Sequence, residues 1–208
     1  MLNSDVFVKQ RTFPRMPTAK LADIAEVRMG YSFRSRLEPD PAGDVAVIQM
    51  KDIDDADLLH PEGLTRIQMP DLKDRHLVQE GDLLFRSRGG SNSAALVAAS
   101  LGRTVLAAPM ILIRPQVTAI APAYLQWFIN QPVTQSGLAS QAEGTAVKMI
   151  SKAALETLPV ALPALEVQLK IVEIGQLSAL ETRLSDALRD RRRTLFERIL
   201  MQKAQDSR

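Results

Sequence analysis

Two segments of the sequence concentrate side chains that can bond base edges or phosphates. Residues 31–36 and 86–92 each mix arginines with hydroxyl, amide or aromatic groups. An arginine can donate two hydrogen bonds to one guanine, an asparagine can bond adenine, and a serine can bond a base or a phosphate. A lysine after Gly144 suits a phosphate, although each of these residues can also be an ordinary exposed loop residue. The candidate binding residues are Tyr31, Arg34, Arg36, Arg86, Arg88, Ser91, Asn92 and Lys148.

Signatures of an enzyme are mostly absent. Neither of the common Gly-rich phosphate-binding motifs occurs, and the stretch 89–93 lacks the second glycine of a nucleophile elbow. The Asx-Pro-Pro-aromatic tetrapeptide of adenine methyltransferases is also missing. Asp40, Asp71 and Lys73 can be arranged into a nuclease-like pattern, but such a match arises by chance in a chain with 24 acids. We therefore expect no catalytic residues.

Metal and thiol chemistry find little support in the composition. The chain has no cysteine, which excludes a disulfide scaffold, a thiolate zinc site and a cysteine nucleophile. Its two histidines, His60 and His76, lie in polar segments typical of turns. We expect no bound metal and no cofactor.

Composition and charge are those of a globular protein with an uneven surface. The chain has 208 residues, of which 46% are hydrophobic and 24% charged, and its formal net charge is +2. Residues 51–82 are acidic overall, whereas residues 1–20 and 83–163 are basic, so one face can meet an anion while another stays solvated. No apolar run reaches about 18 residues, and residues 1–20 show no secretory signal. These observations favour a soluble cytoplasmic protein with no membrane partner.

Three regions are predicted along the chain. Residues 1–17 lack periodicity and are interpreted as an arm. Residues 18–163 alternate short apolar runs with short helical patterns, which predicts a β-rich α+β domain. The expected strands are 45–50, 64–69, 83–87, 110–114 and 160–162, and the expected helices are 122–130, 151–158 and one that Thr18 caps and Gly30 stops.

Residues 164–208 form the third region and predict one amphipathic helix, about 60 Å long at ~1.5 Å per residue. Its apolar residues recur mostly at steps of three and four. A helix of this length extends beyond a domain of ordinary size, so its apolar stripe needs a cover. The simplest cover is a helix of another molecule, and the alternative is folding back on its own domain. The stripe is interrupted by Arg189–Arg193, a run that suits either solvent, phosphate or an acidic partner.

The junction between domain and helix combines several positions in a fixed order: Gly144–Ser151, Leu155, Leu158, Val160, Leu162, Pro163, Leu165, Gln168, Ile171 and Val172. This order resembles the junction of DNA specificity subunits of type I restriction–modification enzymes. Two further pieces are similar to the family: Leu21–Val27 followed by Gly30, and Glu80–Phe85. Ala164 departs from the pattern, because a second proline is common there.

The resemblance implies a non-catalytic subunit that binds double-stranded DNA and recruits adenine methyltransferase subunits and, in full complexes, a motor-nuclease subunit. S-adenosylmethionine is then expected only in the methyltransferase. Typical members carry two recognition domains and two long helices in about twice this length, and each domain reads half of a split target. A half-length member is expected to form a homodimer through an antiparallel coiled coil and to read an inverted repeat. The expected helix contacts are Leu169, Val172, Leu177, Leu180, Leu184, Leu188, Leu195 and Ile199.

Two other functions fit the same residues. A free-standing dimeric DNA-binding protein, such as a repressor, uses both surfaces and binds DNA tightly without a methyltransferase. An interaction module docks a partner through the helix and binds no DNA. The three hypotheses differ in whether methyltransferase, DNA alone or neither accompanies the chain.

Overall fold

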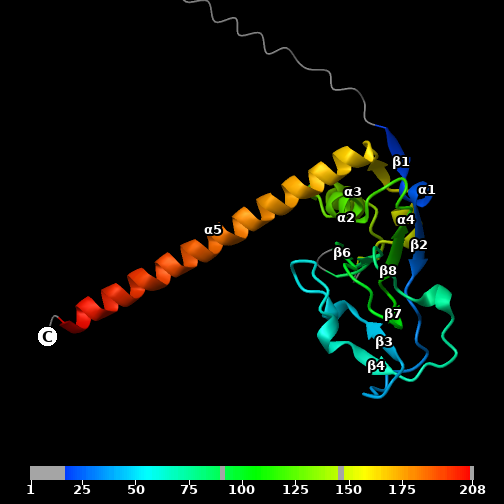
Figure 1. The fold of residues 1–208 in the computed structure, drawn as a ribbon, viewed down its shortest axis with the longest axis horizontal. Helices are drawn as coiled ribbons and strands as arrows, with labels where there is room; N and C mark the ends of the chain where they lie inside the picture. Colours follow the sequence, from blue (N-terminus) through cyan, green and yellow to red (C-terminus); the bar gives the residue numbers. More distant parts are fainter. Residues whose placement is uncertain (1–16, 90–91, 145–147, 207–208) are drawn as a thin grey trace, which may run out of the picture.

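The computed structural model describes residues 17–89, 92–144 and 148–206. These residues form a β-rich α+β domain from which one long helix, α5 (Leu165–Asp206), projects (Figure 1). The predicted fold class is therefore confirmed for the domain and for the helix. The predicted arm lies outside the described residues, except for Pro17. Among the described residues, no helix is both long and apolar enough to cross a membrane.

The described strands form three sheets. One is four-stranded and antiparallel in the order β2-β8-β5-β6, and one is three-stranded in the order β4-β3-β7, with β3 and β7 parallel. Strand β1 pairs only with β9. The strands are β1 (Thr18–Lys20), β2 (Ala25–Met29), β3 (Val45–Ile48), β4 (Thr65–Ile67), β5 (Leu83–Phe85), β6 (Ala94–Leu96), β7 (Thr104–Leu106), β8 (Ile111–Pro115) and β9 (Pro159–Ala161).

Short helices cover one face of the four-stranded sheet. Helix α4 lies within the predicted helix 151–158, and Ser151 caps it, because its Oγ accepts a hydrogen bond from the amide of Ala154. Proline occupies the first turn of both α2 and α3, where its missing N–H costs nothing. Besides α5, the helices are α1 (Leu21–Ile24), α2 (Pro122–Ile129), α3 (Pro132–Ser140) and α4 (Lys152–Glu156), with 3-10 turns at Met50–Asp52, Pro61–Gly63 and Asp74–His76.

Alternate residues of the strands enter different apolar layers. In β5, Leu83 and Phe85 pack beneath the helices, whereas Leu84 enters a second layer. In β3, Ile48 enters the same second layer, whereas Val47 packs in a third layer on the opposite face. The second layer therefore lies between the two larger sheets. Because both faces of these strands are buried, the strands appear in the sequence as continuous apolar runs.

The helix predicted from its cap at Thr18 toward Gly30 is wrong at both ends, because Thr18–Lys20 forms strand β1 and only Leu21–Ile24 is helical. Helix α1 ends at Ile24, and Ala25–Met29 continues as β2, paired with β8 along its whole length. The first apolar residues fit a helix, but the alternation of buried Val27 with exposed Glu26 fits a strand, and sheet pairing outweighs the local preference. Gly30 is needed for a close approach, since a Cβ there would lie 2.7 Å from the backbone of Ala107.

A buried ion pair joins β8 to the turn before β5. Arg114 donates from Nε and Nη2 to the two carboxylate oxygens of Asp82, each at 2.7 Å, and Asp82 also accepts from the amide of Gln79. The Asp82 side chain is only 1% exposed. Its hydrogen bond raises the pKa of Arg114 above the ordinary value. The pair fixes the two strands that carry the first two apolar layers.

We expect Arg114→Ala to lower the free energy of unfolding by about 3 kcal/mol, because it leaves the Asp82 carboxylate buried without its cation. Urea unfolding followed by circular dichroism measures the change. The control is Arg103→Ala, whose partner Asp44 is 36% exposed, so that the loss there is below about 1 kcal/mol. Equal losses in the two variants would contradict the role of burial.

The root of α5 is attached to the domain by Gln168, which is fully buried. Its Oε1 accepts from the amide of Ala121, at the start of α2, at 2.8 Å. Its Nε2 donates to the carbonyls of Pro163 and Ala119 at 2.8 and 3.3 Å. One side chain thus fixes the start of α5 to the segment that leads into α2.

Farther along α5, Gly175 lets the helix lie close to Trp127. A Cβ at this position would lie 3.2 Å from Cδ1 of the indole, which is tighter than most contacts of a Cβ. Ile171 and Val172 pack on the same apolar layer as Trp127, so Val172, predicted as a contact with a second helix, packs against its own domain. The residues from 176 onward are exposed, so the described domain covers only the root of α5.

We expect Gln168→Ala to lower the free energy of unfolding by about 2 kcal/mol, because it leaves the amide of Ala121 buried without an acceptor. The amide of Ala121 is expected to exchange with solvent faster in the same variant, as measured by hydrogen–deuterium exchange. Gln176→Ala removes the same type of side chain from an exposed position of the same helix and should change neither quantity. Unchanged exchange at Ala121 in Gln168→Ala would show that this side chain does not attach the helix.

Candidate nucleic-acid interface

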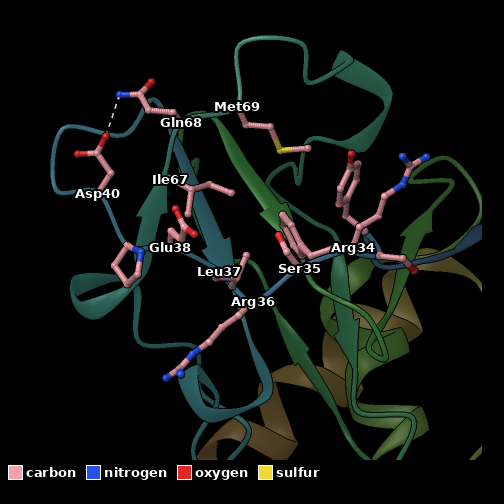
Figure 2. A pocket seen from close by; sticks show the side chains of 13 residues that line it. Arg34, Ser35, Arg36, Leu37, Glu38, Asp40, Ile67, Gln68 and Met69 are labelled. Carbon is pink, nitrogen blue, oxygen red and sulfur yellow. Dashed lines mark hydrogen bonds between the residues drawn. The ribbon is translucent and has the colours of Figure 1, made fainter.

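A ridge of polar and basic side chains, formed by residues 32–37, lies beside the three-stranded sheet. On one side it borders a hollow of about 710 Å³, whose opposite wall is Ile67–Met69 at the end of β4 (Figure 2). On the other side it borders a second hollow of about 480 Å³, whose opposite wall includes Met50 and Pro109. Arg34 and Arg36 are exposed and extend in different directions from the ridge (Figure 2). A protruding segment of this kind can enter a groove.

The ridge is supported from below by aromatic packing. Tyr31 is half-buried, its ring lies 4.9 Å from that of Phe33, and it makes an edge contact with His76. The amide of Tyr31 donates to the carbonyl of Leu106, and its own carbonyl accepts from the amide of Ala108. The base of the ridge is therefore fixed to β7 and to the segment that follows it.

Asp40 closes the far end of the ridge segment as a turn residue. Its Oδ1 accepts from the amide of Ala42 at 2.9 Å, and its Oδ2 accepts from Nε2 of Gln68 at 3.2 Å (Figure 2). No group of three or more His, Asp or Glu side chains that could hold a metal ion occurs in the part of the chain that the structure describes. The structure thus gives Asp40 a local role in the turn.

The second predicted segment adjoins the second hollow. The hydroxyl of Ser87 donates to the carbonyl of Pro109 at 2.6 Å, and a Cβ on Gly89 would lie 3.6 Å from the end of Met50. The segment that carries Lys148 lies next to it, because Arg88 forms a β-bridge with Met149. The ridge and the two loops that were predicted separately therefore form one continuous surface, which we call the recognition face.

The cations of the recognition face have no partners among the described residues. Arg34, Arg36, Lys51, Arg88 and Lys148 are exposed, and none makes an ion pair or a side-chain hydrogen bond within that part of the chain. In contrast, the arginines of the scaffold are all bonded to protein groups. These are Arg28, Arg66, Arg75, Arg86, Arg103 and Arg114. The recognition face thus holds positive charge that the fold does not use.

Comparison with known families identifies this arrangement. The model of the type I restriction modification DNA specificity domain matches residues 16–190. The chain belongs to this family. The resemblance found at the junction of domain and helix is thereby confirmed, and the family's members are specificity domains, in agreement with the expectation of a non-catalytic chain. No curated protein matches the chain in sequence.

Solved structures of type I specificity subunits share the fold. The HsdS subunit from Thermoanaerobacter tengcongensis aligns with a TM-score of 0.59 and 19% identity over 84% of this chain and 44% of that one. The S subunit from M. genitalium aligns with a TM-score of 0.52 and 12% identity over 86% and 42%. A chain from a study of type I complex assembly and conformational transition aligns with a TM-score of 0.61 and 18% identity over 85% and 42%. This specificity domain therefore spans less than half the length of each of these chains.

Three of the predicted binding residues are engaged in internal contacts of the specificity domain. Arg86 is 11% exposed and donates to the carboxylate of Asp57 and to the hydroxyl of Ser93. Asn92 donates to the carbonyl of Arg86 at 3.1 Å, and Tyr31 packs beneath the ridge as described. Ser91 lies outside the described residues. The predicted residues that stand free on the recognition face are Arg34, Arg36, Arg88 and Lys148.

Lys51 belongs to the recognition face but was not predicted from the sequence. It lies in the 3-10 turn Met50–Asp52, which Asp52 closes by accepting from the amide of Gln49 at 2.7 Å. Lys51 is surrounded by acidic residues in the sequence, so the charge pattern did not indicate a basic binding residue there. The available signal was its position directly after a buried strand, as for the other loops of the face.

The acidic segment that follows forms a turn that Asp54 closes. Asp54 accepts from the amides of Ala56 and Leu58, and it lies 2.9 Å from Nε2 of His60. This hydrogen bond raises the pKa of His60 and lowers that of Asp54. His60 is thus a surface turn residue, as predicted.

Proposed function

We propose that this specificity domain is the non-catalytic DNA-recognition subunit of a type I restriction–modification system and binds duplex DNA through its recognition face. The observation that carries the proposal is the division of its arginines between those that the fold binds and those that it leaves free. Scaffold arginines are bonded to the protein, whereas Arg34, Arg36, Lys51, Arg88 and Lys148 are exposed and unpaired among the described residues. When unpaired cations bind phosphates, the counterions condensed on the DNA are released, which favours binding.

The ridge suits direct reading of bases, and the adjoining loops suit phosphates. Arg34 and Arg36 protrude, and an arginine that reaches the major groove can bond guanine at two atoms. Lys51, Arg88 and Lys148 lie on the loops beside the ridge and can position the domain through the backbone of the duplex. Arg86 acts as a positioning residue in this proposal, because its guanidinium holds the Asp54–Asp57 turn against the loop that carries Arg88.

Loss of Arg36 should relax sequence preference, and loss of Lys148 should weaken binding to all sequences. The probe is a duplex selected from a randomised library by the unaltered protein, with fluorescence anisotropy measured at several salt concentrations. We expect Arg36→Ala to cost about 1–3 kcal/mol on the selected duplex and to relax one position. We expect Lys148→Ala to reduce the slope of log K against log salt by about 0.9.

Lys20→Ala is the matched control, because Lys20 is exposed on β1 at the root of the domain. Arg86→Ala is expected to weaken binding by a similar ~1–3 kcal/mol and also to destabilise the domain, unlike Arg36→Ala. Wild-type affinity and sequence preference in both Arg36→Ala and Lys148→Ala would contradict the proposal.

The proposal includes an adenine methyltransferase partner that binds S-adenosylmethionine, and a motor-nuclease subunit in full complexes. It is supported by the family and by the lack of a methyltransferase motif in this chain. Affinity capture from native cells, read by mass spectrometry, tests it. Capture of DNA without a methyltransferase would favour the repressor-like alternative, and capture of neither would favour the interaction module.

We further propose that two copies pair through α5, so that two recognition domains face a bipartite, inverted-repeat target. Nine residues, or two and a half turns, separate the attached Gln168 from Leu177, so the stripe that begins at Leu177 lies on the face opposite the domain. Leu184 and Leu188 are 62% and 52% exposed. Because this stripe points away from its own domain, folding back does not cover it, and a second helix does.

Leu184→Glu should convert the dimer into a monomer, because it buries a charge in the middle of the paired stripe. Sedimentation velocity at micromolar concentration measures the outcome. Ala179→Glu places the same charge on the opposite, exposed face of α5 and should leave the dimer intact. A monomeric unaltered protein would contradict self-pairing while leaving DNA binding by the single domain open to its own test.

A further inference from the structure

The exposed stripe of α5 follows an eleven-residue repeat. Its positions advance in steps of three, four and four residues, which gives 3.67 residues per turn, close to the 3.6 of a straight helix. The stripe therefore runs nearly parallel to the helix axis and can meet a second helix over a long distance with little supercoiling. The exposed members are Leu169, Glu173, Leu177, Leu180, Leu184, Leu188, Arg191, Leu195 and Ile199.

Between Leu169 and Ile199, two members of this stripe are charged, one acid and one base. Glu173 and Arg191 are both exposed, and neither makes an ion pair among the described residues. In contrast, Arg189 and Arg193 pair with acids of their own helix, Asp186 and Asp190. The two opposite charges within an otherwise apolar stripe are thus left for another molecule.

We propose that a second copy of this chain covers the stripe in one antiparallel register, with Glu173 opposite Arg191 of the second copy and the reverse. The inference rests on the self-pairing proposed above and adds its register. Three pairs of stripe positions are symmetric about position 182, and a fourth pair, Leu177 and Leu188, misses that symmetry by one residue. Residues 173 and 191 are equally distant from that position, as are residues 169 and 195 and residues 180 and 184. A two-fold axis there places Leu169 opposite Leu195, Leu180 opposite Leu184 and the acid opposite the base, with Leu177 one residue away from exact opposition to Leu188.

This register is favoured by charge complementarity. A slide of one helix by one turn brings Leu184 opposite its own copy and Glu173 opposite Leu195, so that a carboxylate faces a leucine. A parallel pair brings Glu173 opposite Glu173 and Arg191 opposite Arg191, and like charges repel. The antiparallel register centred at position 182 avoids both arrangements.

The register also fixes the distance between the two recognition domains. Fourteen residues separate Gln168 from position 182, so the two attachment points lie about 42 Å apart along the helix pair. This distance corresponds to about twelve base pairs of B-DNA at ~3.4 Å per step. One ion pair repeated by symmetry thus selects the spacing that the dimer presents to its target.

Disulfide cross-linking tests the register directly, since the chain has no cysteine of its own. Glu173→Cys/Arg191→Cys is expected to oxidise to a covalent dimer, because cysteines that face each other satisfy the short Cα separation of a disulfide. Glu173→Cys alone and Arg191→Cys alone should stay uncrosslinked, whereas an equimolar mixture of the two should cross-link. Cross-linking of either single variant with itself would indicate a parallel pair and overturn the proposal. Efficient cross-linking of Leu184→Cys with itself, together with no cross-linking of the double variant, would indicate a register shifted by one turn and would also overturn it.

Charge reversal gives a second test that does not depend on oxidation. Glu173→Arg and Arg191→Glu should each weaken the homodimer at least tenfold in sedimentation equilibrium, and an equimolar mixture should recover heterodimer of wild-type affinity. Failure of the mixture to recover, with the unaltered protein still dimeric and Leu184→Glu monomeric, would overturn the register and leave self-pairing standing. A monomeric unaltered protein would overturn both.

Discussion

The geometry of this specificity domain depends on how α5 is attached, and one buried amide side chain makes that attachment. Gln168 bonds the carbonyls of Pro163 and Ala119 and the amide of Ala121, so the helix cannot turn at its root without breaking buried hydrogen bonds. Packing of Gly175 near Trp127 extends the attachment by two turns. A glycine inside a helix costs about 1 kcal/mol relative to alanine. Its presence here is explained by the space that the indole requires.

The basic side chains of the domain differ in whether the fold itself binds them. An arginine in the scaffold satisfies buried carboxylates and carbonyls, as Arg114 does for Asp82, and it thereby loses its attraction for an external anion. A lysine or arginine on the recognition face makes no such bond, so its charge remains for a ligand. The net charge of +2 conceals this separation, because the acids gather in residues 51–82. Charge at the level of the whole chain is therefore a poor guide to this protein, and position on the fold is a good one.

Much of the fold was predictable because its central strands are buried on both faces. Val45–Ile48 and Ile111–Pro115 stand out as apolar runs, and α5 stands out by its length. The strand Ala25–Met29 was missed, because its pairing with β8 is a tertiary contact that local periodicity does not show. Strands β6 and β7 were also missed, and in β6 two of the three residues are alanines, which are depleted in strands. Among the binding candidates, Arg88 could be placed on a free loop, but the engagement of Arg86 by Asp57, 29 residues away, could not be foreseen.

The ridge of the recognition face and the root of α5 lie at different ends of the domain, and the sheets lie between them (Figure 1). Motion within those sheets would change the position of the recognition face relative to the helix. The Asp82–Arg114 pair lies within this connection and bonds at two atoms with defined directions. Apolar side chains could fill the same space without the cost of desolvating two charges, but they would not impose a direction. We infer that a domain whose task is to hold one surface at a fixed place benefits more from the directional pair than from the stability that an apolar pair would add.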